Sequence, residues 1–120
     1  MTTTKETGDI AEGLAQDYLL KQGYKILDTN WHFSHLELDI VAQDQQQLVI
    51  VEVKSRNGIR YEHPAEAVTQ TKINRIIEAA EAYIIKNDLF WETRFDVITI
   101  IFLKERFELE HFKNAFYPTL

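Results

Sequence analysis

Residues 94–103 (RFDVITIIFL) restrict the fold more than any other segment, because they carry apolar side chains on both faces of a potential strand. Successive side chains of a strand point to opposite faces of a sheet. A strand that is apolar on both faces belongs in the interior of a sheet that is covered on both sides. The segment therefore predicts a central strand in an α/β fold.

Two other segments have the spacing of apolar residues, three and four apart, that is typical of an amphipathic helix. The first is expected from Thr7, a suitable N-cap, to Gly23, which suits the position after a helix end. The second is expected over 64–86, with Pro64 as its first residue and the pair 87–88 at its end. The expected buried stripes are Ile10, Ala11, Leu14, Ala15, Tyr18 and Leu19 in the first helix, and Val68 or Thr69, Ile73, Ile76, Ile77, Ala80 and Ile84 in the second.

Short strand-like segments follow the first helix, at about 24–29, 36–43 and 48–56. A further edge strand is expected in the tail, 106–116. The order is therefore helix, three strands, helix, strand, in a single domain over 1–120 whose residues 1–7 form a polar, flexible tail. Alternation in the second strand is expected to put Leu36, Leu38, Ile40 and Ala42 on one face and Glu37, Asp39 and Val41 on the other.

The second and third strands are joined by a short polar connection, which predicts an antiparallel hairpin. Paired residue numbers in such a hairpin add to a constant, so one pair sets all the others. The expected pairs are Asp44 with Gln47, Asp39 with Glu52, and Glu37 with Lys54. Opposed side chains project to the same face with their Cβ atoms about 5 Å apart. These charged groups are therefore expected to form one cluster.

Two opposed carboxylates repel each other, and a divalent cation would compensate for that repulsion. Magnesium commonly binds one or two carboxylates and completes its shell with water and phosphate oxygens. Lys54 lies two residues after Glu52, so its amine would reach the same face and meet a phosphate or the attacking water. Asp39 followed by Glu52-x-Lys54 thus has the D…ExK form used in metal-dependent phosphodiester cleavage. The alternative is a salt-bridged, solvent-exposed face of an ordinary strand.

Several blocks of sequence together form a more specific pattern. They are GDIAEGLAQDYL (8–19), the pair Asn30-Trp31, ELDIVA (37–42), VIVEVKSR (49–56), Lys72, RFDV (94–97) and NAF (114–116). With these blocks the chain resembles, from about Gly8 to Phe116, the YraN-like family of uncharacterised bacterial proteins. That family is assigned to the restriction-endonuclease-like, PD-(D/E)xK, superfamily. The resemblance implies a core of helix, three strands, helix and strand, with a mixed central sheet flanked by helices.

The resemblance also implies a role for individual residues. It assigns metal binding to Asp39 and Glu52, with a backbone carbonyl near Val53, and it makes Lys54 the catalytic lysine. Similarity to archaeal Holliday-junction resolvases adds Glu12 as a further ligand or water-positioning carboxylate. Glu37 is expected as an auxiliary ligand, and the implied cofactor is Mg²⁺ or Mn²⁺. The chain departs from the family pattern at Ala11, His32 and Leu36, which affects the expected backbone geometry near Glu37 and one phosphate contact.

Basic residues gather near the expected site, although the chain as a whole is acidic, with a net charge of −6. The candidates for nucleic-acid binding are Arg56, Lys72 and Arg75, of which the last two lie three apart on one helix and can reach the same strand of phosphates. No segment resembles a base-reading helix, so any selectivity is expected for branched or single-stranded structure. His32, His35 and His63 lack a ligand spacing and are expected at the surface.

The expected function is therefore a metal-dependent nuclease that acts on DNA, with a homodimer as a possible assembly. The alternative is a noncatalytic module with the same fold that binds nucleic acid or protein. The chain has no cysteine, which fits a reducing cytoplasm. No apolar run approaches the roughly 20 residues that cross a bilayer, so no membrane partner is expected.

Overall fold

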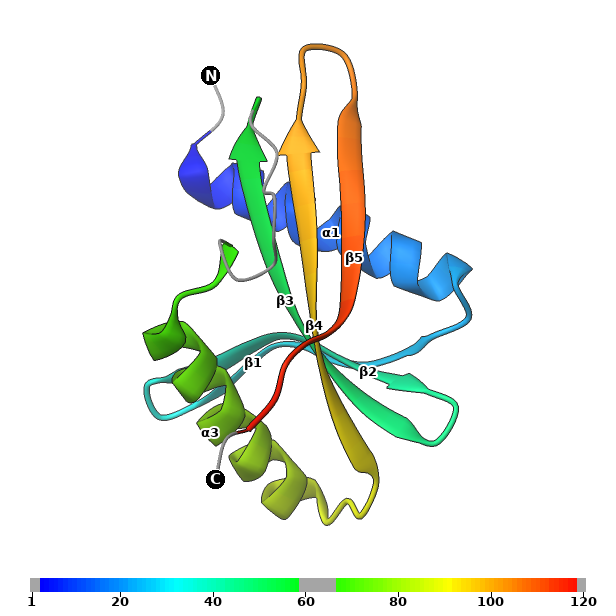
Figure 1. The fold of residues 1–120 in the computed structure, drawn as a ribbon, viewed down its shortest axis with the longest axis vertical. Coiled ribbons are helices and arrows are strands. Elements are labelled where there is room, and N and C mark those ends of the chain that lie inside the picture. Colours follow the sequence, from blue (N-terminus) through cyan, green and yellow to red (C-terminus); the bar gives the residue numbers. More distant parts are fainter. Residues whose placement is uncertain (1–2, 59–66, 119–120) are drawn as a thin grey trace.

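The computed structural model describes residues 3–58 and 67–118. These residues form a mixed five-stranded sheet with a helix on each face (Figure 1), which confirms the predicted α/β fold. The strands lie in the order β1-β2-β3-β4-β5, and the β3–β4 pair is parallel while the other pairs are antiparallel. The elements are α1 (Thr4–Lys21), β1 (Lys25–Phe33), β2 (Leu36–Asp44), β3 (Gln47–Asn57), α3 (Gln70–Asn87), β4 (Glu92–Phe102) and β5 (Phe107–Phe116).

Each face of the sheet has its own apolar core. Residues Val49 and Val51 of β3 pack with Ala11, Ala15 and Leu19 of α1. The other face of β3, with Leu48 and Ile50, packs with Ile76, Ala79, Ala80 and Tyr83 of α3. Strand β4 contributes to both cores, as its two-sided apolar pattern predicts, and the expected edge strand is present as β5.

The N-cap of α1 differs from the prediction. Thr3, not Thr7, caps the helix, because its side chain accepts a hydrogen bond of 3.0 Å from the backbone N–H of Glu6. Residues 4–7, which the sequence assigned to the polar tail, are the first turn of α1. Ile10 was predicted to belong to the buried stripe but is 49% exposed, whereas Ala11, Ala15 and Leu19 are buried as expected.

The start of α3 also differs from the prediction. Its N-cap is Thr69, which accepts a hydrogen bond from the N–H of Lys72 at 3.2 Å. Pro64, the predicted first residue, lies outside the described residues. The helix ends at Asn87, which confirms the prediction that the pair 87–88 ends it, and Asp88 caps it with a left-handed backbone conformation (φ 53°).

A buried polar network anchors β4 to its neighbours on the α1 side. The Asp96 carboxylate has no exposed surface, and both of its oxygens accept hydrogen bonds from Arg94 at 2.8 and 2.9 Å. His111 of β5 lies 2.7 Å from the same carboxylate, and Arg94 also donates to the Tyr24 hydroxyl at 2.6 Å. These bonds lower the pKa of Asp96 even though burial opposes this shift. The network joins β4 to β5 and to the connection between α1 and β1.

Strand β2 does not alternate as predicted, and the irregularity lies beside the expected site. Leu36 and Leu38 pack in the α3 core together with Val41, whereas Ile40 and Ala42 pack in the α1 core. The faces of β2 therefore exchange between Leu38 and Val41. The neighbouring strand β1 is irregular at the same level, because Asn30 has a left-handed backbone (φ 49°) between the pairs Thr29–Ile40 and Trp31–Leu38.

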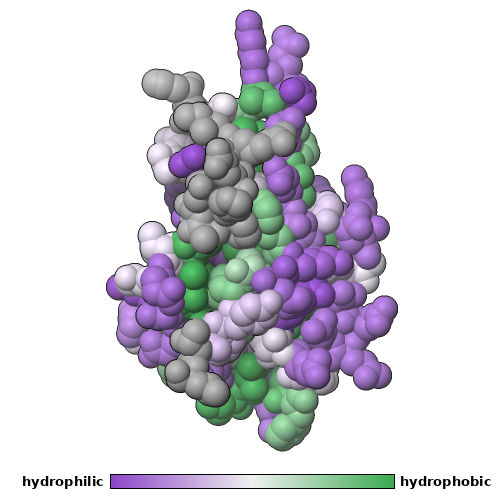
Figure 2. Space-filling model, in the orientation of Figure 1, coloured by the Kyte–Doolittle hydropathy of each residue, from purple (hydrophilic) through white to green (hydrophobic). Residues whose placement is uncertain are grey.

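The two most exposed large apolar side chains among the described residues lie near each other in the sequence, at one end of the molecule. Ile85 is 78% exposed and Phe90 is 90% exposed, at the end of α3 and in the connection to β4. Hydrophobic atoms gather at this lower end in Figure 2, while hydrophilic residues cover much of the right-hand side. No helix among the described residues is both long enough and apolar enough to cross a membrane.

Candidate active site

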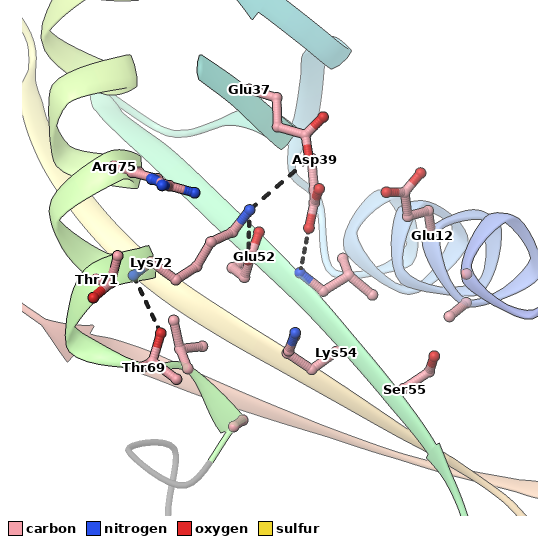
Figure 3. Close-up of a pocket in the computed structure, with 15 residues that line it drawn as sticks. Glu12, Glu37, Asp39, Glu52, Lys54, Ser55, Thr69, Thr71, Lys72 and Arg75 are labelled. Atoms are coloured by element: carbon pink, nitrogen blue, oxygen red, sulfur yellow. Dashed lines mark hydrogen bonds and ion pairs between the residues drawn. The ribbon is translucent and has the colours of Figure 1, made fainter. Parts of the chain in front are cut away.

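Asp39 and Glu52 come together where β2 and β3 cease to pair. The predicted register is confirmed from Asp44–Gln47 to Ile40–Val51, and the ladder ends there, one step before the predicted pair. The Asp39 carboxylate instead accepts a hydrogen bond of 2.9 Å from the backbone N–H of Val53. The Asp39 side chain thus replaces a backbone carbonyl as the acceptor for Val53, and this bond places Asp39 against β3 beside Glu52 (Figure 3).

The carboxyl group of Glu52 is the most strongly perturbed acid at this site. Glu52 is only 5% exposed, and its pKa is raised to about 9. Burial is the largest cause of this rise, followed by the hydrogen bond with Asp39 and the charge of Asp39. The amines of Lys72 and Lys54 lower the pKa but do not reverse the shift. At neutral pH and without a metal ion, Glu52 therefore holds a proton next to the Asp39 carboxylate.

Glu12 reaches the same cavity from α1. Burial raises its pKa most, the Asp39 charge raises it further, and a side-chain hydrogen bond from Asn30 lowers it. Asn30 lies on β1 at the level of Asp39, where its left-handed backbone breaks the regular strand. Asn30 belongs to one of the sequence blocks that carry the family resemblance, but no role at the site was predicted for it. An asparagine within a strand was the available signal, because Asn adopts positive φ more readily than most residues.

A cavity of about 480 Å³ brings together most of the predicted site. It is lined by Glu12, Glu37, Asp39, Glu52, Val53, Lys54, Lys72 and Arg75, together with Ser55, Thr69 and neighbouring residues of α1 and α3. Figure 3 shows acidic side chains from α1, β2 and β3 facing basic side chains from β3 and α3. Arg56, the remaining predicted residue, is an exposed residue of β3 that does not line this cavity.

The predicted contact between Glu37 and Lys54 is wrong, since the β2–β3 ladder does not extend to them. Among the described residues, Glu37 instead forms an ion pair with Lys72 of α3 at 3.9 Å, and Nε2 of His32 on β1 lies 3.0 Å from a Glu37 oxygen. His32 and His35 are exposed, as expected, and His63 lies outside the described residues. Among the described residues, the amine that forms a short contact with Glu52 belongs to α3: the Lys72 amine lies 3.6 Å from a Glu52 oxygen.

The chemistry of the donors fits a divalent cation held by two carboxylates. Asp39 and Glu52 supply hard oxygen ligands in a partly buried position, and magnesium sites with one or two carboxylates are common. The described residues contain no group of three or more acidic or histidine side chains arranged around one point. Glu12 and Val53 both line the cavity, and the Glu12 carboxylate and the Val53 carbonyl therefore remain predicted ligands.

Comparison with known proteins identifies the family. Residues 11–100 match the family model described as "Uncharacterised protein family UPF0102". The chain is 43% identical over 117 residues to a UPF0102 protein of Flavobacterium psychrophilum, an alignment that covers 98% of each chain. It is also 42% identical over 120 residues to a UPF0102 protein of Phocaeicola vulgatus, covering 100% of this chain and 99% of the relative. A UPF0102 protein of Clostridioides difficile is 43% identical over 113 residues, covering 93% of this chain and 97% of the relative. The family that the sequence blocks resemble is thus confirmed, and the chain belongs to the uncharacterised protein family UPF0102.

Proposed function

We propose that the protein is a divalent-metal-dependent nuclease that hydrolyses phosphodiester bonds in DNA. The observation that carries the proposal is that the Asp39–Glu52 pair lines the same cavity as Lys54, Lys72 and Arg75 and faces them. A phosphodiester needs a cation at its oxygens and a positioned water, and this cavity combines groups suited to both tasks.

Asp39 and Glu52 would hold Mg²⁺ or Mn²⁺, with Glu12 and the Val53 carbonyl as further ligands. The ion would supply positive charge at the scissile phosphate and would lower the pKa of a bound water. Lys54 lines the same cavity from β3, where its amine can bind a phosphate oxygen or orient the attacking water. Glu37 would support the site without binding the metal ion directly, because its carboxylate contacts His32 and forms an ion pair with Lys72.

Lys72 and Arg75 suit the binding of DNA beside the scissile bond. They lie on one face of α3, three residues apart, and both line the cavity. Contacts to phosphates give affinity without sequence preference, so the proposal extends to branched or single-stranded DNA as substrate. A homodimer is part of this proposal, since cleavage of a junction in two strands needs two sites. A cytoplasmic location is also part of it.

The test is cleavage of single-stranded, duplex and branched DNA by the purified protein with Mg²⁺ or Mn²⁺. We expect cleavage that EDTA abolishes and that Asp39→Asn and Lys54→Met each reduce at least about a hundredfold, as is typical for loss of a ligand or a charge-stabilising group. Lys25→Met is the matched control, because Lys25 is an exposed lysine at the far end of β1. Cleavage that persists at the wild-type rate in Asp39→Asn would refute the proposal.

A noncatalytic binding module is the second candidate, and one observation favours it. The Lys72 amine already lies beside Glu52 and Glu37, so a lysine meets part of the need for positive charge. This alternative predicts no cleavage and no rise in melting temperature with Mn²⁺, whereas a cation that binds the folded state must raise it. Salt-dependent binding to labelled DNA would then separate a nucleic-acid partner from a protein partner.

A further inference from the structure

Lys72 occupies a position that brings it into conflict with a bound metal ion. Its amine lies 3.6 Å from Glu52, which is 5% exposed, and 3.9 Å from Glu37, whose side chain is half exposed. The Lys72 side chain itself is 32% exposed, so the amine borders both the carboxylates and solvent. In Figure 3 this amine points from α3 toward the acidic side chains.

The place of Lys72 in its helix gives a reason for this contact. Lys72 lies in the first turn of α3, which contains no acidic residue, and the positive end of the helix dipole disfavours a lysine there. Proximity to the carboxylates offsets that cost. A divalent cation bound to Asp39 and Glu52 would remove the attraction and repel the ammonium group, because two cations would then compete for the same oxygens.

We infer that Lys72 couples metal binding to DNA binding: its amine is the counter-cation of the acidic pair in the metal-free protein, and a divalent ion displaces it toward the phosphates of the substrate. This inference rests on the proposed function and adds an exchange of partners to it. In the absence of metal the Lys72 amine is held by the one negative charge that Asp39 and Glu52 share and by the Glu37 carboxylate, and it contributes little to DNA binding. When the metal ion is bound, Lys72 joins Arg75 at the wall of the cavity.

The coupling has two consequences that can be measured separately. Removal of the amine takes away a competitor, so Lys72→Met should bind the cation more tightly than the wild type. It should also reduce the gain in DNA affinity that the cation produces, because the cation then has no Lys72 amine to displace toward the phosphates. Arg75→Met is the matched control, since Arg75 lines the same cavity and forms no ion pair with any carboxylate of the described residues.

The first measurement is calorimetric titration with Ca²⁺ of the wild type, Lys72→Met and Lys72→Gln, each first checked by circular dichroism. We expect both variants to bind Ca²⁺ about three- to tenfold more tightly, which corresponds to the loss of one ion pair of intermediate exposure. The second is fluorescence anisotropy of a labelled single-stranded oligonucleotide with and without Ca²⁺. The ratio of the two affinities should be equal in the wild type and Arg75→Met and smaller in Lys72→Met.

Equal or weaker Ca²⁺ binding by both Lys72 variants would overturn the inference, as would a Ca²⁺ effect on DNA affinity that these variants retain in full. The proposed function could still stand in that case. Failure of the wild type to bind Ca²⁺ or Mn²⁺ at all would overturn the inference together with the proposed metal dependence. The two failures are therefore distinguishable in the same titration.

Discussion

Replacing Glu52 by glutamine should change how the stability of the metal-free protein depends on pH. Burial and the neighbouring Asp39 raise the pKa of Glu52 to about 9. Glutamine has the same shape and can still donate a hydrogen bond to Asp39, but it carries no titratable proton. The stability difference between the wild type and Glu52→Gln therefore isolates the titration of this one group.

The sign follows from proton binding. Between the ordinary pKa of a glutamic acid and the raised value, the folded protein keeps the Glu52 proton while the unfolded chain loses it. Unfolding then releases a proton, so the free energy of unfolding falls as pH rises, with a limiting slope of about 1.4 kcal/mol per pH unit. From pH 6 to pH 8 the wild type should lose up to about 3 kcal/mol relative to Glu52→Gln. Below about pH 4 the difference should be constant.

Urea unfolding followed by circular dichroism, in EDTA and at half-unit steps from pH 5 to pH 8.5, measures this difference directly. Glu81→Gln is the control, because it makes the same replacement at an exposed position of α3. A flat difference for Glu52→Gln over the whole range would refute the assignment of a proton to Glu52 in the folded protein. It would also remove the electrostatic argument that a divalent cation is needed there.

Three further predictions concern the elements that hold the site in place. Arg94→Met should lower the free energy of unfolding by about 3 kcal/mol in urea denaturation, because it leaves the fully buried Asp96 short of its main partner; a loss below about 1 kcal/mol would contradict this account. Asn30→Gly keeps the left-handed backbone and should melt close to the wild type, whereas Asn30→Val should cost about 1–2 kcal/mol more, and equal melting of the two variants would exclude strain at this position. Thr69→Ala removes the N-cap of α3 and should lower the free energy of unfolding by about 1 kcal/mol in thermal unfolding. Thr71→Ala is the control, because Thr71 lies two residues further along and is not the cap; equal losses of stability in the two variants would argue against the cap.

Features that depend on local periodicity could be predicted from the sequence. The two-sided apolar pattern of 94–103 predicted an interior strand, and the short connection between β2 and β3 predicted their register from Asp44–Gln47 onward. Both predictions are confirmed, because side chains alternate along any strand and a hairpin links residue numbers by its loop length. The predicted register of the hairpin also indicated that carboxylates of β2 and β3 lie close together.

Features that depend on irregular backbone could not be predicted in this way. The exchange of faces in β2 and the left-handed Asn30 in β1 interrupt the alternation on which the pairing argument relied. Asp39 therefore meets Glu52 through a hydrogen bond to the Val53 N–H and not as a cross-strand pair. The residue types of the acidic pair were predicted, but the way in which the backbone brings them together was not.

The sequence by itself determined the order of elements, the apolar faces and the identities of the acidic and basic groups. Only the tertiary structure decided that the Lys72 amine of α3 lies 3.6 Å from Glu52. It also decided that Arg94 and His111 meet at a buried Asp96. The physical reason is the range of the interactions. Periodicity acts over a few neighbouring residues, whereas the partner of a charged side chain depends on how a helix settles on the sheet, and the contacts of the whole core set that position.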